Sequence, residues 1–393
     1  MSKILVVNAG SSSLKWSLHD KEDLHLIASG LCERINLDGR IITKYQGEKF
    51  IDEVTLPNHT TAVKELIKLW AKYDVITDLN TIAAIGFRTP FSGHKYLTPA
   101  FFTDEVREGI EEAKKFIPLH APATLAAVEA FNENIPSVKK IIAQDTAFHV
   151  TVPKINATFS INQEWAEKYH VYKYGYHGLS HDFINNKMKS ILGKDKNNLI
   201  IAHLGSGSSV CAVKDSKSFD ISVGFSSSDG LIMGTRAGTV DPLIYDFLVR
   251  VENNSAQEVF DMFVKQSGLL GISGISNDIR DLHAACAEGN EKAQFAVDMF
   301  VWRVVDTIAA YINKIGEPID AIVFTAGIGE NDEIVRKSVI EKLPSFGVKL
   351  DEEKNLEKYG SELLISTKDS KIPVYKVRTD EEIVIARYVK EMI

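Results

Sequence analysis

The chain has 393 residues, of which 45% are hydrophobic and 25% charged, and its formal net charge is −8. This length exceeds what one ordinary hydrophobic core supports, so two domains are expected. The negative charge argues against nucleic acid as the main partner, and no apolar run approaches the roughly 18 residues of a membrane span. The N-terminus shows no secretory signal and the three cysteines are scattered, so a reduced, cytoplasmic protein is expected.

The first predicted element is a buried strand over Ile4–Val7, followed by a turn rich in glycine and serine and by a second strand that begins near Lys15. Such a turn offers backbone N–H groups, hydroxyls and little side-chain bulk, which together make room for a phosphate. The same order of strand, Gly/Ser turn and strand recurs over Leu199–Val213. Two such turns predict two half-molecules that hold one polyphosphate.

Further along the chain, apolar runs that predict buried strands end at polar or glycine residues. These runs are Thr81–Gly86 before Arg88, Lys139–Ala143 before Asp145, Leu199–Ala202 before His203, Ala321–Phe324 before Thr325 and Pro373–Val377 before Glu381. In open α/β sheets the ligand lies beyond the carboxyl ends of the strands, so these polar groups are expected on one rim. Most strands end in polar residues in any case, and a single strand end is therefore a weak indication.

Segments with helical periodicity alternate with the strands, which indicates an α/β fold. The expected helices are Thr103–Phe116, Ala121–Phe131, Ser180–Leu192, Pro242–Val251, Asn290–Lys314 and Ile383–Met392. The segment Leu24–Val54 alternates apolar and polar residues and is expected to form antiparallel hairpins. The repeated Gly/Ser turn places the domain boundary near Phe148–Thr151.

Three glycine-containing segments carry side chains suited to phosphate. Gly230–Pro242 presents Arg236 between glycines, and its guanidinium can bind phosphoryl or carboxylate oxygens through two hydrogen bonds. Tyr174–His181 places His177 beside a glycine, and Val323–Asn331 predicts a strand, a glycine turn and a helix start. Neither a complete dinucleotide-binding fingerprint nor a P-loop is present. Arg236 could instead cap a turn. His177 and His181 could pair as zinc ligands, but an evident third ligand is lacking.

Seven motifs, in this order along the chain, resemble those of the acetate kinase family, part of the superfamily of sugar kinases, heat-shock ATPases and actin. They are NAGSSSLK at Asn8–Lys15, DTAFH at Asp145–His149, YGYHGLSH at Tyr174–His181, HLGSGSS at His203–Ser209, GLIMGTRAG at Gly230–Gly238, TAGIGEN at Thr325–Asn331 and TDEEIVIAR at Thr379–Arg387. The resemblance covers essentially the whole chain. It implies an α/β fold of two ribonuclease-H-like (actin-like ATPase) domains that flank a nucleotide cleft, residues 1–147 with 382–393 and residues 148–381.

The resemblance also implies roles for individual residues. Arg88 would bind the substrate carboxylate or the acyl phosphate, while His177 and Arg236 would stabilise the transition state of phosphoryl transfer. Asp145 would act as an acid/base or metal-orienting carboxylate, and Mg²⁺ (or Mn²⁺) would bind at Asn8 and Glu381. ATP or ADP would contact Lys15, Ser11, Ser13, His203, Leu204, Gly205, Ser206, Gly207, Asp278, Ile279, Arg280, Gly327, Ile328, Gly329, Glu330 and Asn331. Because a carboxylate acceptor is already ionised at neutral pH, we expect Asp145 to orient the metal or the substrate and not to abstract a proton.

The chain departs from the family pattern where the small acid is expected. Pro90 replaces a valine that would line the methyl pocket, Ser227 stands where proline is usual, and Tyr176 occupies a position that is usually Phe or Ala. Leu119 and Pro90 are the expected pocket wall. One methylene in a hydrophobic pocket is worth only about 1–3 kcal/mol, so propionate or a larger acid could compete. Neutral drift with compensating packing explains these departures equally well.

The resemblance therefore implies reversible transfer of a phosphoryl group from ATP to acetate, which gives acetyl phosphate and ADP, and it also implies a homodimer. A close alternative is a kinase of propionate or another short-chain fatty acid. An alternative of another class is a non-catalytic, ATP-switched protein of the actin or heat-shock type. Arg88 and Arg236 argue against this alternative, because they suit an anionic second substrate. A sugar kinase is disfavoured, because a neutral hydroxyl acceptor would need a base.

Overall fold

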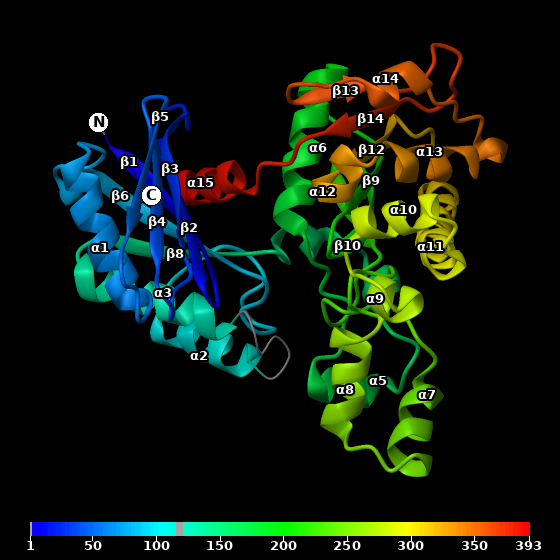
Figure 1. The fold of residues 1–393 in the computed structure, drawn as a ribbon, viewed down its shortest axis with the longest axis horizontal. Coiled ribbons are helices and arrows are strands. Elements are labelled where there is room, and N and C mark those ends of the chain that lie inside the picture. The colour runs from blue at the N-terminus through cyan, green and yellow to red at the C-terminus, as the bar shows by residue number, and fades with distance from the viewer. Residues whose placement is uncertain (1, 115–120) are drawn as a thin grey trace. The chain divides into compact units, whose positions relative to one another are not determined.

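The computed structural model describes residues 2–114 and 121–393, which form two compact units (Figure 1). Unit 1 comprises the chain up to Val150 together with Asp380–Ile393, and unit 2 comprises Thr151–Thr379. The domain boundaries inferred from the sequence stay a prediction. In the structure Glu381 groups with unit 1.

Unit 1 is built on a sheet whose described strands have the order β5-β4-β3-β2-β1-β6-β8-β7. The strands are β1 (Lys3–Gly10), β2 (Ser13–Asp20), β3 (Leu26–Glu33), β4 (Arg40–Tyr45), β5 (Glu48–Glu53), β6 (Ile82–Thr89), β7 (Ala100–Phe101) and β8 (Lys139–Gln144). The strands β1 to β5 pair antiparallel, which confirms the hairpins predicted over Leu24–Val54. The strand β6 lies parallel to β1 and to β8.

Helices cover both faces of this sheet. They are α1 (His59–Lys72), η1 (Leu79–Thr81), α2 (Asp104–Ala113), α3 (Ala121–Asn134) and α15 (Glu381–Met392), with η2 (Ala147–Thr151) at the division between the units. Trp16 and Phe87 point to one face, where their rings meet aromatic rings of α1 and α3. Gly86 points to the other face, where an added Cβ would lie 2.6 Å from Ile385 of α15. The last helix can therefore pack directly on β1 and β6 (Figure 1) because residue 86 has no side chain.

Unit 2 contains a second sheet, in which the described strands have the order β11-β10-β9-β12-β14-β13. The strands are β9 (Leu199–Leu204), β10 (Ser208–Lys214), β11 (Lys217–Ile221), β12 (Ala321–Thr325), β13 (Glu362–Leu364) and β14 (Val374–Val377). The helices are α4 (Lys154–Ala157), α5 (Gln163–Tyr169), α6 (Gly178–Leu192), α7 (Pro242–Asp246), η3 (Phe247–Val251), α8 (Ala256–Lys265), α9 (Gly268–Ser273), α10 (Ile279–Ala287), α11 (Glu291–Ile315), α12 (Ala326–Asn331), α13 (Glu333–Glu341), η4 (Pro344–Phe346) and α14 (Glu352–Leu356).

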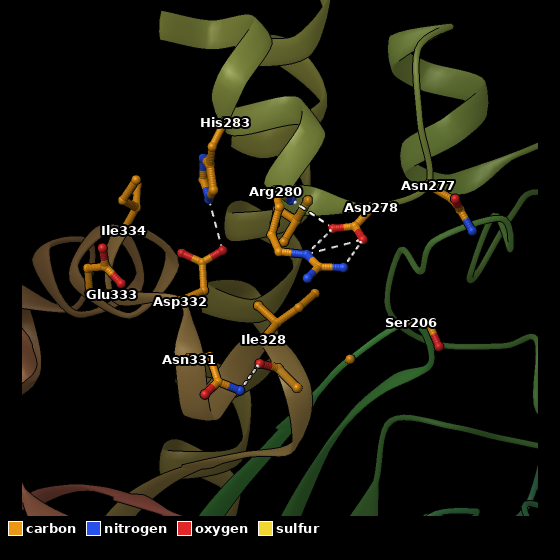
Figure 2. Close-up of a pocket in the computed structure, with 13 residues that line it drawn as sticks. Ser206, Asn277, Asp278, Arg280, His283, Ile328, Asn331, Asp332, Glu333 and Ile334 are labelled. Carbon is orange, nitrogen blue, oxygen red and sulfur yellow. Dashed lines mark hydrogen bonds and ion pairs between the residues drawn. The ribbon is translucent and has the colours of Figure 1, made fainter. Parts of the chain in front are cut away.

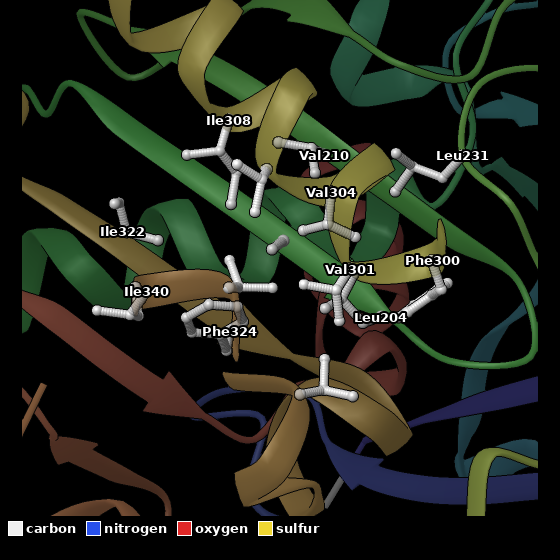
Figure 3. Packing of buried hydrophobic residues seen from close by; sticks show 14 of the residues in the cluster. Leu204, Val210, Leu231, Phe300, Val301, Val304, Ile308, Ile322, Phe324 and Ile340 are labelled. Atoms are coloured by element: carbon white, nitrogen blue, oxygen red, sulfur yellow. The ribbon is translucent and has the colours of Figure 1, made fainter. Parts of the chain in front are cut away.

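The long helix α11 covers one face of this second sheet (Figure 3). The side chain of Asn290 caps its first turn, and the helix ends at Gly316, whose φ of 68° suits glycine. Its buried side chains recur every three or four residues and pack on inward-facing residues of β9, β10 and β12, such as Leu204 and Phe324. Side chains alternate along a strand, so the residues between these face α6. The predicted helix Asn290–Lys314 is confirmed to within a residue at each end.

Two segments differ from the prediction. The helix expected over Pro242–Val251 is α-helical only in α7, because its second half, η3, has π-helical geometry. The glycine turn expected after β12 is instead the short helix α12. Its backbone turns at Ala326, where φ is 66°, and the Glu330 carboxylate accepts a hydrogen bond from the Ala326 N–H. None of the described helices is both long and apolar enough to cross a membrane.

Candidate active site

A group of hydrogen-bonded histidines and serines lies where β9 and β10 face α6. His203 and Ser209 are paired neighbours in the β9–β10 register, on the face opposite α11. The Nδ1 atom of His203 lies 2.8 Å from the Ser180 hydroxyl of α6. The Ser209 hydroxyl lies 2.9 Å from Nδ1 of His177 and 2.8 Å from Nε2 of His181. The alternation of β9 and β10 thus places polar residues at the start of α6 and apolar residues at α11.

His177 is held in a strained conformation beside a glycine turn. Its backbone is left-handed, with φ 58° and ψ 21°, immediately before α6. For a residue other than glycine this costs on the order of 1–3 kcal/mol, and such strain clusters at functional sites. A Cβ added to Gly207 would lie 2.8 Å from Nη2 of Arg236 and 3.2 Å from Nε2 of His177. The structure therefore brings His177, Arg236 and the second Gly/Ser turn together, and glycine leaves the space between them open.

Arg236 is a largely buried cation with no acidic partner among the described residues. One of its nitrogens donates a hydrogen bond to the Ser227 carbonyl oxygen. Burial lowers the pKa of the Arg236 guanidinium, because the charged form loses hydration. A buried charge without a counter-ion is costly, and an anion bound beside it would offset that cost. The position suits a phosphoryl group, whose oxygens a guanidinium binds well.

A cavity of about 650 Å³ in unit 2 lies next to the first glycine of that turn (Figure 2). Its size is that of a pocket for a nucleoside or a small cofactor. Residues that were expected to contact ATP line it from three segments: Gly205, Ser206, Asp278, Ile279, Arg280, Gly327, Ile328 and Asn331. These segments are far apart in the sequence. The structure therefore joins three separate motifs in one pocket.

An ion pair holds one wall of the cavity. Arg280 donates two hydrogen bonds to the Asp278 carboxylate from Nε and one from Nη2, and these bonds lower the pKa of Asp278 to about 2. The same carboxylate caps α10 by accepting a hydrogen bond from the Arg280 N–H at 3.0 Å. Ile279 and Ile328 add apolar surface to the cavity. A pocket of this composition can bind an aromatic base and a polar sugar.

Five residues that line the cavity were not expected from the sequence. They are Asn277, His283, Asp332, Glu333 and Ile334. His283 Nε2 lies 2.8 Å from an Asp332 oxygen (Figure 2), and this hydrogen bond raises the pKa of His283. His283 is four residues after Ile279 and so shares its face of α10. That spacing was the available signal. Asn277 and Asp332 directly adjoin residues that were expected at ATP, and Glu333 and Ile334 follow Asp332 in the chain.

Five residues of unit 2 that were expected at ATP do not line this cavity: His203, Leu204, Gly207, Gly329 and Glu330. Leu204 is fully buried in the core against α11. The Glu330 carboxylate accepts backbone hydrogen bonds from Ala326 and Thr379, both at 3.0 Å, so it stabilises the fold of this segment. Gly329 is buried within α12. His203 belongs with the histidines and serines described above.

In unit 1 a second cationic group lies at the end of β6. Arg88 donates two hydrogen bonds of 3.0 Å to Asp145 and lies 2.7 Å from a Glu381 oxygen. Burial alone would lower the pKa of Arg88, but the two carboxylates outweigh it and raise that pKa. Burial also raises the pKa of Glu381, and Asp145 adds to this effect while Arg88 opposes it. Three expected residues, which are far apart in sequence, are therefore in direct contact.

The remaining residues expected in unit 1 lie along the β1–β2 hairpin. Asn8 and Lys15 are paired in its register, and Ser11 and Ser13 lie at its turn. Lys15 forms an ion pair with Glu382. Like Arg88, Lys15 therefore contacts the N-terminal turn of α15. The oxygens of Asn8, Asp145 and Glu381 are hard donors, the type of ligand that Mg²⁺ prefers.

The four residues expected around the acyl group belong to different parts of the chain. Pro90 follows β6 in unit 1, whereas Tyr176 and Ser227 belong to unit 2. The Tyr176 hydroxyl donates a hydrogen bond of 3.2 Å to the Phe225 carbonyl, and Ser227 offers its carbonyl to Arg236. Leu119 lies outside the described residues.

Comparison with known proteins places this site in context. The model of the acetokinase family matches residues 3–387. An acetate kinase from Mycoplasmopsis pulmonis (strain UAB CTIP) is 44% identical over 390 residues, 99% of each chain. The crystal structure of Porphyromonas gingivalis acetate kinase is 36% identical, with a TM-score of 0.89 over 98% of both chains. A propionate kinase from Francisella tularensis subsp. tularensis SCHU S4 is 35% identical, with a TM-score of 0.91 over 99% of both chains. This likeness confirms the predicted fold class.

Proposed function

The chain belongs to the acetokinase family, and from this premise we propose that it transfers the γ-phosphoryl group of ATP to acetate, reversibly and with Mg²⁺. The products are acetyl phosphate and ADP. The observation that carries this proposal is Arg236, a half-buried guanidinium without an acidic partner among the described residues, beside His177 and Gly207. The charge of the Arg236 guanidinium would be compensated by a bound anion, and the transferred phosphoryl group is the anion that a kinase binds.

Each unit would contribute different parts of this chemistry. The cavity at Ile279 and Ile328 would hold the nucleoside, and the backbone of the second Gly/Ser turn would approach the phosphates. His177 and Arg236 would donate hydrogen bonds to the equatorial oxygens of the transferred group, where negative charge spreads at the transition state. Arg88, which Asp145 and Glu381 hold in place, would orient the carboxylate of the acid.

The Mg²⁺ ion would be held by the oxygens of Asn8 and Glu381, with Asp145 orienting it. When bound, the ion neutralises phosphate charge as the phosphoryl group moves. The acetate acceptor is already ionised at neutral pH, so Asp145 has no proton to remove. Asp145→Asn should therefore lower turnover and weaken the response to Mg²⁺ together. Lost turnover with unchanged dependence on Mg²⁺ would contradict this role for Asp145.

Acetate is the substrate that we propose, and propionate is the second candidate. One observation favours propionate as a candidate substrate: a solved structure that matches at a TM-score of 0.91 carries the name propionate kinase. Pro90 also lies two residues from Arg88 and stands where the family usually has valine. A hydrophobic pocket separates acids that differ by one methylene by only about 1–3 kcal/mol. We therefore expect turnover to be highest with acetate and still measurable with propionate.

A hydroxylamine trap tests the proposal, because hydroxylamine converts an acyl phosphate to a hydroxamate, which forms a coloured complex with Fe³⁺. Acetate, propionate and butyrate would be compared at equal concentration with ATP and Mg²⁺. We expect hydroxamate with acetate, less with propionate and none without ATP. ATP binding or hydrolysis without any hydroxamate would favour the ATP-switched alternative. A preference for propionate or butyrate would place this chain among the kinases of longer acids.

We also propose a homodimer that covers the exposed apolar surface of α7 and η3. Leu243 is 70% exposed and Phe247 is 48% exposed, and three more apolar side chains accompany them: Ile244, Tyr245 and Val251. A soluble protein rarely leaves such a cluster uncovered. Light scattering should give twice the 43.7 kDa of one chain, and the double variant Leu243→Glu, Phe247→Glu should give the mass of one chain. An unchanged mass in this variant would place the dimer interface elsewhere.

A further inference from the structure

One hydroxyl bridges two histidines beside the proposed phosphoryl site. The Ser209 hydroxyl oxygen lies 2.9 Å from His177 Nδ1 and 2.8 Å from His181 Nε2. Ser209 and His181 are fully buried. No other hydrogen bond of the Ser209 hydroxyl is formed with the described residues. The opposite ring nitrogen of His177, Nε2, is the atom that lies toward Gly207, near Arg236.

The bridge restricts where protons can sit, because a serine hydroxyl carries one hydrogen. If the hydroxyl donates to Nδ1 of His177, His181 must donate its Nε2–H to the hydroxyl oxygen. If it donates to His181 instead, His177 must carry a proton on Nδ1. In a fully satisfied bridge, one of the two facing nitrogens carries a proton and the other does not. With protons on both, the buried hydroxyl would have no acceptor, which costs about 1–3 kcal/mol.

We propose that Ser209 is a positioning residue that fixes the tautomer of His177. The hydroxyl donates to Nδ1 of His177 and receives the Nε2–H of His181. A neutral His177 must then carry its proton on Nε2, as an N–H donor directed at the space beside Gly207. That donor is what a phosphoryl oxygen requires. The kinetic consequence rests on the proposed function, whereas the tautomer is a property of the protein itself.

Three side chains lie close to the ring of His177. The cation Arg236 lies on its Nε2 side, across Gly207. The ring of His203 from β9 stacks on that of His177, with centroids 4.4 Å apart and an angle of 14° between the planes. His181 of α6 lies across the bridge. These contacts hold the ring in place, with Nε2 directed at the space beside Gly207.

Nitrogen-15 NMR of the histidine side chains tests the tautomer directly, because protonated and bare ring nitrogens have well-separated shifts. His177→Gln and His181→Gln would assign the two signals in the full chain. We expect a bare Nδ1 and a protonated Nε2 for His177, and a protonated Nε2 for His181. In Ser209→Ala the His177 signal should shift toward a tautomer mixture. A protonated Nδ1 on His177 in the unsubstituted protein, or no change in Ser209→Ala, would overturn the proposal.

Steady-state kinetics provide a second test of the proposed role of Ser209. Ser209→Ala should lower kcat about tenfold, equivalent to roughly 1.4 kcal/mol, with KM for ATP and for the acid changed less than about twofold. Ser209→Thr keeps the hydroxyl and should recover most of kcat. The control is Ser366→Ala, another buried serine, whose hydroxyl accepts a hydrogen bond from the Val374 N–H. Equal losses in Ser209→Ala and Ser366→Ala would contradict the positioning role. If the unsubstituted protein makes no acyl phosphate, the proposed function fails and NMR alone decides the tautomer.

Discussion

Arg88 and Arg236 are held in opposite ways, and this difference separates their roles. Arg88 contacts two carboxylates, Asp145 and Glu381, so its charge is compensated and its position fixed. Arg236 donates to a backbone carbonyl and has no carboxylate partner among the described residues. We therefore expect Arg88 to act as a pre-oriented anchor and Arg236 to gain its counter-ion only when substrate binds.

Replacing each arginine by leucine should separate stability from turnover. Arg88→Leu leaves two buried carboxylates without their cation and should lower the free energy of unfolding by about 3 kcal/mol at pH 7.5. The loss should be smaller at pH 5, because the pKa of Glu381 is already raised and protonation removes its buried charge. Arg236→Leu should leave stability nearly unchanged, although both variants should lose turnover. Urea unfolding tests this, and an equal loss of stability in the two variants would contradict it.

His283 should make part of the stability depend on pH. Asp332 raises the pKa of His283 above its ordinary value of 6.5, with a smaller contribution from Glu333. A raised pKa means that the ion pair contributes fully below about pH 6.5 and is lost as pH rises through the folded-state pKa. The difference in Tm between the unsubstituted protein and His283→Gln should therefore be larger at pH 6 than at pH 8.5. A difference that grows with pH would show that the pair is not charged as described.

At the scale of elements, Gly207 and Gly327 lie in different surroundings in unit 2. A Cβ on Gly207 would collide with the side chains of Arg236 and His177. A Cβ on Gly327 would meet no atom within 4 Å, yet Gly327 lines the cavity proposed for the nucleoside. We therefore propose that Gly207 makes room for the reacting group and that Gly327 makes room for the nucleotide.

Replacing Gly207 by alanine and replacing Gly327 by alanine should change different kinetic parameters. Gly207→Ala should lower kcat more than tenfold by displacing Arg236 and His177. Gly327→Ala should raise KM for ATP several-fold with kcat nearly unchanged, because its methyl group only narrows the cavity. Gly360→Ala is the matched control, since a Cβ there also meets nothing within 4 Å and it lies outside the cavity lining. Steady-state kinetics would contradict this division if both active-site variants changed the same parameter.

Local elements were predictable because their causes are local. The strand–turn–strand units at β1–β2 and β9–β10 follow from apolar runs interrupted by glycine and serine. The sequence predicted a helix start within Val323–Asn331, but not that the helix begins directly after β12 at Ala326, which reaches a left-handed conformation that the Glu330 carboxylate supports. The π-helical turn η3 likewise has no signal in the sequence pattern that favoured a continuous helix.

At the scale of the whole molecule, unit 1 is completed by the end of the chain. Helix α15 returns to the first sheet with four buried apolar residues, Val384, Ile385, Ala386 and Val389. The same helix begins with Glu381 and Glu382, which contact Arg88 and Lys15. The packing of α15 therefore positions charged groups of the candidate site.

Ile385→Ala tests how far this packing stabilises unit 1. Ile385 is 1% exposed and faces Gly86, where no side chain can fill the space that the substitution leaves. We expect the free energy of unfolding to fall by about 2–4 kcal/mol. The exposed Ile334→Ala in unit 2 should change it by less than about 0.5 kcal/mol. Similar values for the two variants in urea unfolding would contradict the packing described here.

The sequence predicted more of the site than of its supporting contacts. The triad of Arg88, Asp145 and Glu381 was expected from separate strand ends, and the fold brings these residues into contact. The partner of His283 and the bridge formed by Ser209 depend on which side chains meet across distant elements. No local sequence pattern encodes contacts between side chains of distant elements. These two contacts were therefore found only in the structure.

The most direct test of the central claim follows the γ-phosphoryl group itself by phosphorus-31 NMR. The protein would be mixed with ATP, Mg²⁺ and acetate, and each phosphorus signal followed with time. Our account predicts that an acetyl phosphate signal grows in step with ADP, and that adding ADP and acetyl phosphate regenerates ATP. ADP accompanied only by inorganic phosphate, with or without acetate, would contradict it.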